Sequence, residues 1–300
     1  FLLWRPQQKQ VMEAQRFPQD FDGILAGAPV LDFVGTMVNY AAIVQAYDKA
    51  PVPMAKFRLA ADAIYKLCDA KDAVADGVIE HPPACGFQPS VHLPKCANGD
   101  APDCFTPAQI HLFETLYSDQ TVQGKRAYPA WPPGAEAPGA NGLPGWNNWL
   151  IRENQAPLFV QFGESFFRYL AYPQKDPEFR LAQFNFDRDP QRLDWIRTTL
   201  NATDPDLSPF QKRGGKLLLW FGWADPALNP NRAVDYYNEV SAKLGPGTQE
   251  FFRLFMLPGV FHCGGGPGCD DAPLLAVLID WVEKGQAPER IVAAKREGGR

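Results

Sequence analysis

A histidine, a cysteine and a run of glycines stand together in the stretch Leu257–Cys269, whose sequence is LPGVFHCGGGPGC. A histidine that transfers protons is commonly held on a loop beyond a rigid scaffold, where its ring can reach a substrate. The glycines let the backbone turn tightly around it. His262 is therefore a candidate general base. The alternative is a glycine-rich surface loop that happens to carry one of the four histidines of the chain.

An acidic residue precedes His262 in an order that suits nucleophilic catalysis. Asp225 follows one apolar run, and His262 follows the next apolar run 37 residues later. Acid and then histidine, each after a late strand, is the order of an α/β-hydrolase, in which the nucleophile comes earliest. The carboxylate would hold the imidazole in one tautomer, and the imidazole would activate a serine hydroxyl. Alternatively Asp225, which precedes Pro226, only caps a helix.

The elements around both candidates alternate regularly between strand and helix. Apolar runs predict strands at 216–221 and 251–256, and amphipathic spacing predicts helices at 231–244 and 273–284. This order is typical of the closing half of a doubly wound α/β sheet. Ligands of such sheets bind outside the carboxyl ends of the strands, where the loops of both candidates begin.

The first fifty residues show the same alternation of strand and helix patterns, whereas the middle of the chain does not. Phe21–Pro29 predicts a turn, a short buried strand and a loop, and 31–47 predicts a helix. The middle contains proline-rich loops without strand–helix alternation, which favours an insertion. We therefore divide the chain into a first core segment (1–50), an inserted section (51–210) and a second core segment (211–300).

The composition and net charge of the chain indicate which classes of binding partner it lacks. Hydrophobic residues make up 46% and charged residues 21% of the chain, as in globular proteins, and the net charge is −5. No run of lysine and arginine stands out, which argues against nucleic acid or an anionic membrane as a partner. No apolar run is long enough to span a bilayer. A signal peptide upstream of Phe1 cannot be judged, and nothing indicates an oligomeric state.

The first four of six cysteines lie in the proline- and glycine-rich middle section. They lack the CxxC spacing of a zinc site, and small closed loops of this kind are typical of disulfides made in an oxidising compartment. We predict the bridges Cys68–Cys85 and Cys96–Cys104, and hence a secreted or periplasmic protein. Buried thiols are the alternative.

The aromatic stretch that contains Trp131, Trp146 and Trp149 lies in the same section. Flat aromatic walls suit an aromatic acid, so these side chains are candidates for lining an acyl pocket. Plain packing inside this section is the alternative.

Three segments together resemble the tannase/feruloyl esterase family, and the resemblance covers nearly the whole chain. They are Met12–Pro29 (MEAQRFPQDFDGILAGAP), Gly222–Pro226 (GWADP) and His262–Gly268 (HCGGGPG). The resemblance implies an α/β-hydrolase core, formed by 1–50 and 211–300, with a large lid domain at 51–210, and hydrolysis of esters of aromatic acids. The family includes tannases, feruloyl esterases and the enzyme that cleaves mono(hydroxyethyl) terephthalate. By position, it implies that Asp225 is the triad acid and His262 the triad base.

The chain departs from the family pattern at the nucleophile. In the family a Gly-Cys-Ser-x-Gly-Gly elbow lies just before the MEAQ segment. Counting back from Met12 puts Trp4 at the serine position and Leu3 at the cysteine position. An indole is no nucleophile, so we expect a fragment without the serine, without the upstream strands and without esterase activity of its own. A truncation, a frameshift and a real loss of the elbow are all open.

The same departure affects the cysteine that follows the histidine. In the family this cysteine forms a disulfide with the cysteine of the elbow. Cys263 lacks that partner here, because Leu3 cannot form a disulfide. A thiol and a bridge to Cys269 are both open for Cys263.

Three carboxylates stand within eight residues in the segment CDAKDAVADGVI. A hard cation takes such oxygen ligands together with backbone carbonyls, although the spacing is not that of an EF-hand. The resemblance implies a structural Ca²⁺ ion here. Its ligands would be the side chains of Asp69, Asp72 and Asp76 and the carbonyls of Val74 and Val78. Alternatively the acids serve only as turn residues.

Two functions of different class follow. One is a serine esterase on a small aromatic ester, represented here by its lid and the second half of its core. The other is a non-catalytic, calcium-stabilised remnant or binding module. Recovery of the elbow in the parent reading frame would support the first.

Overall fold

The computed structural model describes residues 7–139 and 142–295 of the chain. The described chain falls into two compact units. The sheet unit combines the part up to Asp32 with the part from Ala202 onward, and the inserted unit is Phe33–Asn201. Each unit has a hydrophobic core of its own.

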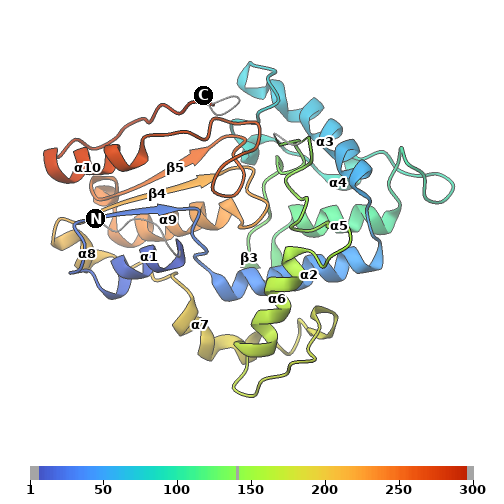
Figure 1. The fold of residues 1–300 in the computed structure, drawn as a ribbon, viewed down its shortest axis with the longest axis horizontal. Coiled ribbons are helices and arrows are strands. Elements are labelled where there is room, and N and C mark those ends of the chain that lie inside the picture. The colour runs from blue at the N-terminus through green and yellow to red at the C-terminus, as the bar shows by residue number, and fades with distance from the viewer. Residues whose placement is uncertain (1–6, 140–141, 296–300) are drawn as a thin grey trace. The chain divides into compact units, whose positions relative to one another are not determined.

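Three parallel strands form the centre of the sheet unit, in the order β1-β4-β5 (Figure 1). The register pairs Ile24 with Leu217, and Leu217 with Phe252. The elements of this unit are α1 (Gln7–Arg16), β1 (Gly23–Gly27), α8 (Ser208–Lys212), β4 (Lys216–Gly222), α9 (Pro230–Leu244), the 3₁₀ turn Pro246–Glu250, β5 (Phe252–Leu257) and α10 (Leu274–Lys284).

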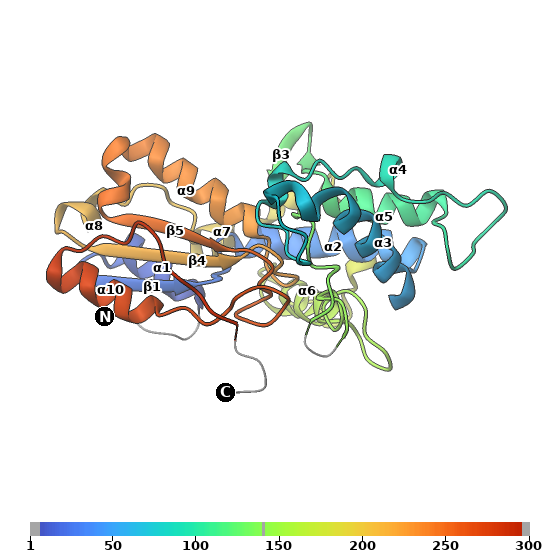
Figure 2. The same cartoon turned by 90° about the horizontal axis from the view of Figure 1, so that it is seen from above.

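Helices cover both faces of this sheet, with α9 on one side and α10 on the other (Figure 2). Alternate residues of a strand point to opposite faces. Leu217 and Leu219 accordingly pack in the cluster that contains α1 and α9, whereas Leu218 packs against Leu278 and Trp281 of α10. Burial of both faces explains why β4 is apolar along its length rather than alternating.

The inserted unit is mostly helical and has an aromatic core. Tyr40 stacks on Phe159 with ring centroids 4.0 Å apart, and Trp131 and Trp146 are buried beside them. Its elements are α2 (Phe33–Lys49), α3 (Met54–Cys68), α4 (Pro89–His92), α5 (Pro107–Tyr117), the hairpin strands β2 (Gln120–Val122) and β3 (Lys125–Tyr128), α6 (Leu158–Tyr169), α7 (Asp194–Leu200), and the 3₁₀ turns Asp69–Asp72, Pro82–Ala84, Leu181–Gln183 and Pro190–Leu193.

The unit boundaries differ from those drawn on the sequence, which were 50/51 and 210/211. Helix α2 packs against α5 and α6, so it belongs to the inserted unit. Its residues are buried on nearly all sides, as expected of a helix that is apolar all round. The predicted strands and helices flanking Asp225 and His262 are confirmed to within one residue.

Both predicted disulfides, Cys68–Cys85 and Cys96–Cys104, are confirmed. Cys263 and Cys269 do not bridge each other. Within the described ranges, no helix has the length and apolar character needed to cross a membrane.

Candidate functional site

Asp225 and His262 lie on the loops that follow two neighbouring parallel strands, β4 and β5. The last register pair of these strands is Gly222 with Leu257. Beyond it the loops stay joined, because Trp223 N–H donates to the carbonyl of Leu257 (2.9 Å) and Ala224 N–H donates to that of Val260 (3.1 Å). The carboxyl ends of the sheet therefore hold the two candidates side by side, as expected from the sequence.

A glycine makes this close approach of the loops possible. A Cβ atom at Gly222 would lie 2.2 Å from the carbonyl oxygen of Val260. Real Cβ atoms do not come so close to backbone, so a side chain here would force the two loops apart. The glycine before Trp223 is thus required by packing at the site.

The carboxylate of Asp225 is almost wholly buried, with 1% of the residue exposed. Its Oδ1 accepts the N–H groups of Ala227 (2.7 Å) and Leu228 (3.0 Å), and its Oδ2 lies 2.9 Å from Nδ1 of His262. An ionised carboxylate can only accept, so Nδ1 carries the hydrogen and Nε2 is left as the proton-accepting atom. Asn229, and not Asp225, caps α9.

The environment of His262 favours its protonated form. Burial on its own lowers the pKa of the imidazole, but the charge and hydrogen bond of Asp225, with a further contribution from Cys263, raise the pKa to about 10. One quarter of the ring remains exposed. The buried anion of Asp225 therefore orients the ring and stabilises the imidazolium that forms when Nε2 accepts a proton.

The glycine-rich turn after His262 is closed on itself. Cys263 has a positive φ of 63°, in the left-handed region. A Cβ at Gly266 would meet the carbonyl oxygen of Gly259 at 2.3 Å, and one at Gly268 would meet that of Pro258 at 1.8 Å. The glycines let the chain fold back onto the strand end that carries His262.

Two residues that the sequence did not single out hold this turn. Oδ2 of Asp270 accepts the N–H of Gly265 (2.6 Å), and Nζ of Lys295 donates to the carbonyl of Gly266 (2.8 Å). Lys295 also lies 3.4 Å from Asp270. An acid after a glycine run is a recognisable turn signal. The lysine comes from a distant segment, and no local pattern points to it.

The predicted nucleophile position, Trp4, and its neighbour Leu3 lie outside the described residues. All five serines of the sequence lie within them. Each occupies a helix or a helix end, and none lies on a loop that leaves the carboxyl end of a sheet strand. They are Ser90, Ser118, Ser165, Ser208 and Ser241.

The three acids of the predicted calcium loop turn towards the backbone. One oxygen each of Asp69, Asp72 and Asp76 accepts a nearby N–H at 2.9–3.0 Å. The described part of the chain contains no group of three acid, histidine or cysteine side chains arranged to hold a metal ion. The three side chains are thus not gathered around one point, and calcium binding through these acids and the carbonyls of Val74 and Val78 stays a prediction.

The tryptophans do not share one role. Trp131 and Trp146 are 2% and 0% exposed, because they pack in the core of the inserted unit. Their indole N–H groups donate to Asn39 and Glu136. The alternative of internal packing is therefore correct for these two residues, while Trp149 is only half-buried.

A doubly covered parallel sheet with an acid–histidine pair on adjacent strand ends defines a protein of the α/β class with a candidate hydrolytic site. Comparison with known proteins agrees. The family model described as tannase and feruloyl esterase matches residues 8–300, so the chain belongs to the tannase and feruloyl esterase family, whose members are carboxylic ester hydrolases.

Individual relatives support this assignment. An esterase of Xanthomonas campestris is 33% identical over 95% of this chain and 56% of its own length. The mono(2-hydroxyethyl) terephthalate hydrolase of Piscinibacter sakaiensis is 30% identical over 94% and 54%, respectively. The crystal structure of feruloyl esterase B from Aspergillus oryzae matches with a TM-score of 0.84 at 26% identity, over 98% of this chain and 61% of that chain. The chain thus spans about half the length of the curated relatives it matches.

Proposed function

We propose that this chain carries the acid and the base of a serine carboxylic ester hydrolase that acts on esters of aromatic acids. The observation that carries the proposal is the 2.9 Å contact between Nδ1 of His262 and the buried carboxylate of Asp225 on adjacent strand ends. The printed names of the relatives, which include feruloyl esterases and a terephthalate ester hydrolase, support the substrate class.

The reaction would follow from this geometry. Nε2 of His262 would take the proton of a serine hydroxyl as the oxygen attacks the ester carbonyl, and would then give it to the departing alcohol. Asp225 would stabilise the imidazolium that forms between these steps. Water would repeat the sequence on the acyl-enzyme and release the acid.

The nucleophile is the part that the described residues do not supply. We propose that the 300-residue chain is a fragment whose serine elbow and upstream strands are absent, and that it is inactive alone. The placement of all five serines in helices or at helix ends supports this. A non-catalytic module is the outcome to expect if no serine is recovered in the parent gene.

Two measurements test these proposals. The first is turnover of methyl ferulate and methyl gallate by the purified chain, with His262→Ala as the control. Turnover that disappears in the variant would show that the chain is no inactive fragment. The second is sequencing of the DNA upstream of the Val11 codon, in search of an in-frame Gly-Cys-Ser-x-Gly-Gly elbow.

If the elbow is recovered, the extended protein tests the roles of the pair. Asp225→Asn and His262→Ala should each lower kcat by about 10³-fold or more, because a misoriented or missing base cannot activate the serine. Asp280→Asn, on the exposed side of α10, is the matched control and should leave kcat unchanged. An Asp225→Asn enzyme with full kcat would disprove the assigned role.

We further propose a structural Ca²⁺ at the loop of Asp69, Asp72 and Asp76, and secretion of the parent protein. Three acids this close in sequence support the first, and two disulfides support the second. A thermal unfolding midpoint that rises with CaCl₂ and falls with EDTA, but does not respond in Asp72→Asn, would support the calcium site. A midpoint that changes with neither CaCl₂ nor EDTA would rule out the calcium site.

A further inference from the structure

A cavity of about 670 Å³ opens in the inserted unit, between the loop after α6 and the turn that precedes α7. Its charged lining residues are three cations and two acids: Lys175, Arg188, Arg192, Asp176 and Asp189. The lining therefore has a surplus of one positive charge, although the whole chain carries a net charge of −5. A local charge opposite to that of the whole chain suits an anionic ligand.

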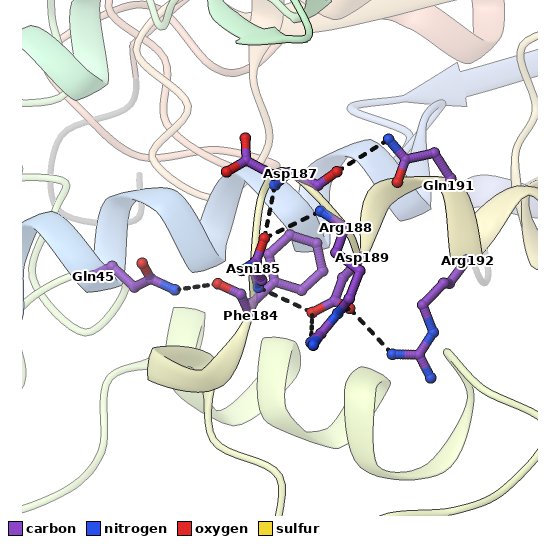
Figure 3. Close-up of polar contacts among 8 residues, drawn as sticks. All are labelled: Gln45, Phe184, Asn185, Asp187, Arg188, Asp189, Gln191 and Arg192. Atoms are coloured by element: carbon purple, nitrogen blue, oxygen red, sulfur yellow. Dashed lines mark hydrogen bonds and ion pairs between the residues drawn. The ribbon is translucent and has the colours of Figure 1, made fainter.

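A single buried carboxylate organises the two arginines (Figure 3). Asp189 is 1% exposed. Arg188 donates to it through Nε (2.8 Å) and Nη2 (3.1 Å), and Arg192 donates through Nη1 (3.1 Å). The N–H of Asn185 is a further donor at 3.0 Å. Burial alone raises the pKa of Asp189, but these donors more than reverse the effect and hold it below its usual range.

Arg192 keeps one edge of its guanidinium for another partner. Among the described residues the only hydrogen bond of this guanidinium is the one from Nη1 to Asp189, so Nε and Nη2 make none. The guanidinium lies over the ring of Tyr172, 4.4 Å from the ring centroid, which fixes its plane. The Nε and Nη2 edge of a fixed guanidinium matches the two oxygens of a carboxylate.

The hydroxyl of Tyr172 is a second unsatisfied donor at the same cavity. It is buried and has no hydrogen-bond partner among the described residues. Burial, and next the charge of Asp189, raises the pKa of Tyr172 to about 12, so the hydroxyl keeps its proton at neutral pH. A buried hydroxyl without a partner destabilises the fold unless a ligand or water pairs with it.

We propose that this cavity binds a small monocarboxylate, with its oxygens received by the Nε and Nη2 edge of Arg192 and by the Tyr172 hydroxyl. The surplus of a single positive charge suits one carboxylate better than a dianionic phosphate. Phe179, which is 7% exposed, lies in the lining and offers an apolar wall to the rest of the ligand. An aromatic or otherwise apolar carboxylate therefore fits best. This proposal is independent of the esterase proposal.

Titration of the purified chain with sodium benzoate tests the proposal, with calorimetry or amide NMR shifts as the readout. Sodium chloride keeps the ionic strength constant. We expect saturable binding with a Kd of about 1–10 mM, the range of one charged contact and a small apolar group. Acetate should bind several-fold more weakly, since it lacks the ring. The absence of saturation with benzoate up to about 50 mM, or tighter binding of inorganic phosphate, would overturn the proposal.

Three variants assign the site. Arg192→Gln should weaken benzoate binding about tenfold, and Tyr172→Phe about fivefold. Arg180→Gln is the matched control, because Arg180 is a half-exposed cation on the same segment that does not line the cavity. Tyr172→Phe should not lower the unfolding midpoint, since it removes an unpaired buried hydroxyl. Unchanged binding in Tyr172→Phe, or equal weakening in Arg180→Gln and Arg192→Gln, would disprove the assignment.

Discussion

Two carboxylates, one in each unit, are equally buried but hold different partners. Asp225 and Asp189 are both 1% exposed. Asp225 accepts two backbone N–H groups and an imidazole, whereas Asp189 accepts one backbone N–H group and two guanidinium groups. An imidazole can gain and lose a proton, but a guanidinium cannot. The first arrangement suits proton transfer, and the second suits a fixed positive site for an anion.

The two carboxylates also lie on different kinds of backbone. Asp225 leaves the end of a strand buried in a parallel sheet, so its position is fixed by the sheet and by the neighbouring loop. Asp189 sits on a turn between short helical segments, and the arginines it binds are more than half exposed. A third buried carboxylate, Glu136, accepts hydrogen bonds from Trp146, from the hydroxyl of Tyr117 and from the N–H of Gly134. None of its partners within the described ranges is a cation, so it serves packing.

Replacing the first carboxylate should have the largest effect. Asp225→Asn removes the anion that raises the pKa of His262, so this pKa should fall from about 10 towards its ordinary value of 6.5. The free energy of unfolding should fall by about 3 kcal/mol, because a buried partner is lost. Histidine ring NMR and urea unfolding measure both effects. Asp280→Asn is the control, and an unchanged pKa of His262 in Asp225→Asn would contradict the comparison.

Replacing the second carboxylate should have a smaller effect, confined to the inserted unit. Asp189→Asn leaves two guanidinium groups facing a neutral amide, but both can turn to water. We expect a loss of about 2 kcal/mol in the free energy of unfolding. The pKa of His262 should not change. A shift in this pKa would mean that the two carboxylates are coupled.

The pH dependence of stability separates the two sites further. The pKa of His262 is raised in the folded state, so its stabilisation is fully present below about pH 6.5 and is lost as the pH rises through about 10. A loss of about 1–2 kcal/mol is expected across this range for a partly exposed ring. Urea unfolding of the wild type and of His262→Gln across this pH range measures the contribution of His262, as the difference between their free energies of unfolding. The Asp189 site should contribute nothing to the difference, because arginine does not titrate there.

The smallest expected effect concerns the turn that carries His262. Asp270→Asn weakens the acceptor for Gly265 N–H and the contact with Lys295, and should lower the free energy of unfolding by about 1 kcal/mol. The donors beside Asp270 lower its pKa despite burial, so its contribution exists above about pH 4 and is lost as the pH falls below that. Acid unfolding measures it. A wild-type profile in the variant would show that the turn does not depend on this acid.

Local patterns were sufficient for much of the sheet unit. Apolar runs predicted β4 and β5, and the loops after them contain the residues proposed for catalysis. The disulfides were also predictable, because their cysteines are near in sequence. The middle of the chain was harder to predict. Its helices α4, α6 and α7 lie among proline-rich loops, where propensity is a weak signal, and their formation depends on packing against α2 and its neighbours.

By itself the sequence determined the α/β alternation, the acid and histidine at successive strand ends, and the two disulfides, because each depends on residues close together in the chain. Only the tertiary structure decided that Lys295 holds the turn of His262, that Trp131 and Trp146 lie inside a core, and that Arg192 and Tyr172 meet at one cavity. These contacts join distant segments, and burial and long-range packing select them. The periodicity of a sequence does not predict which distant residues come into contact.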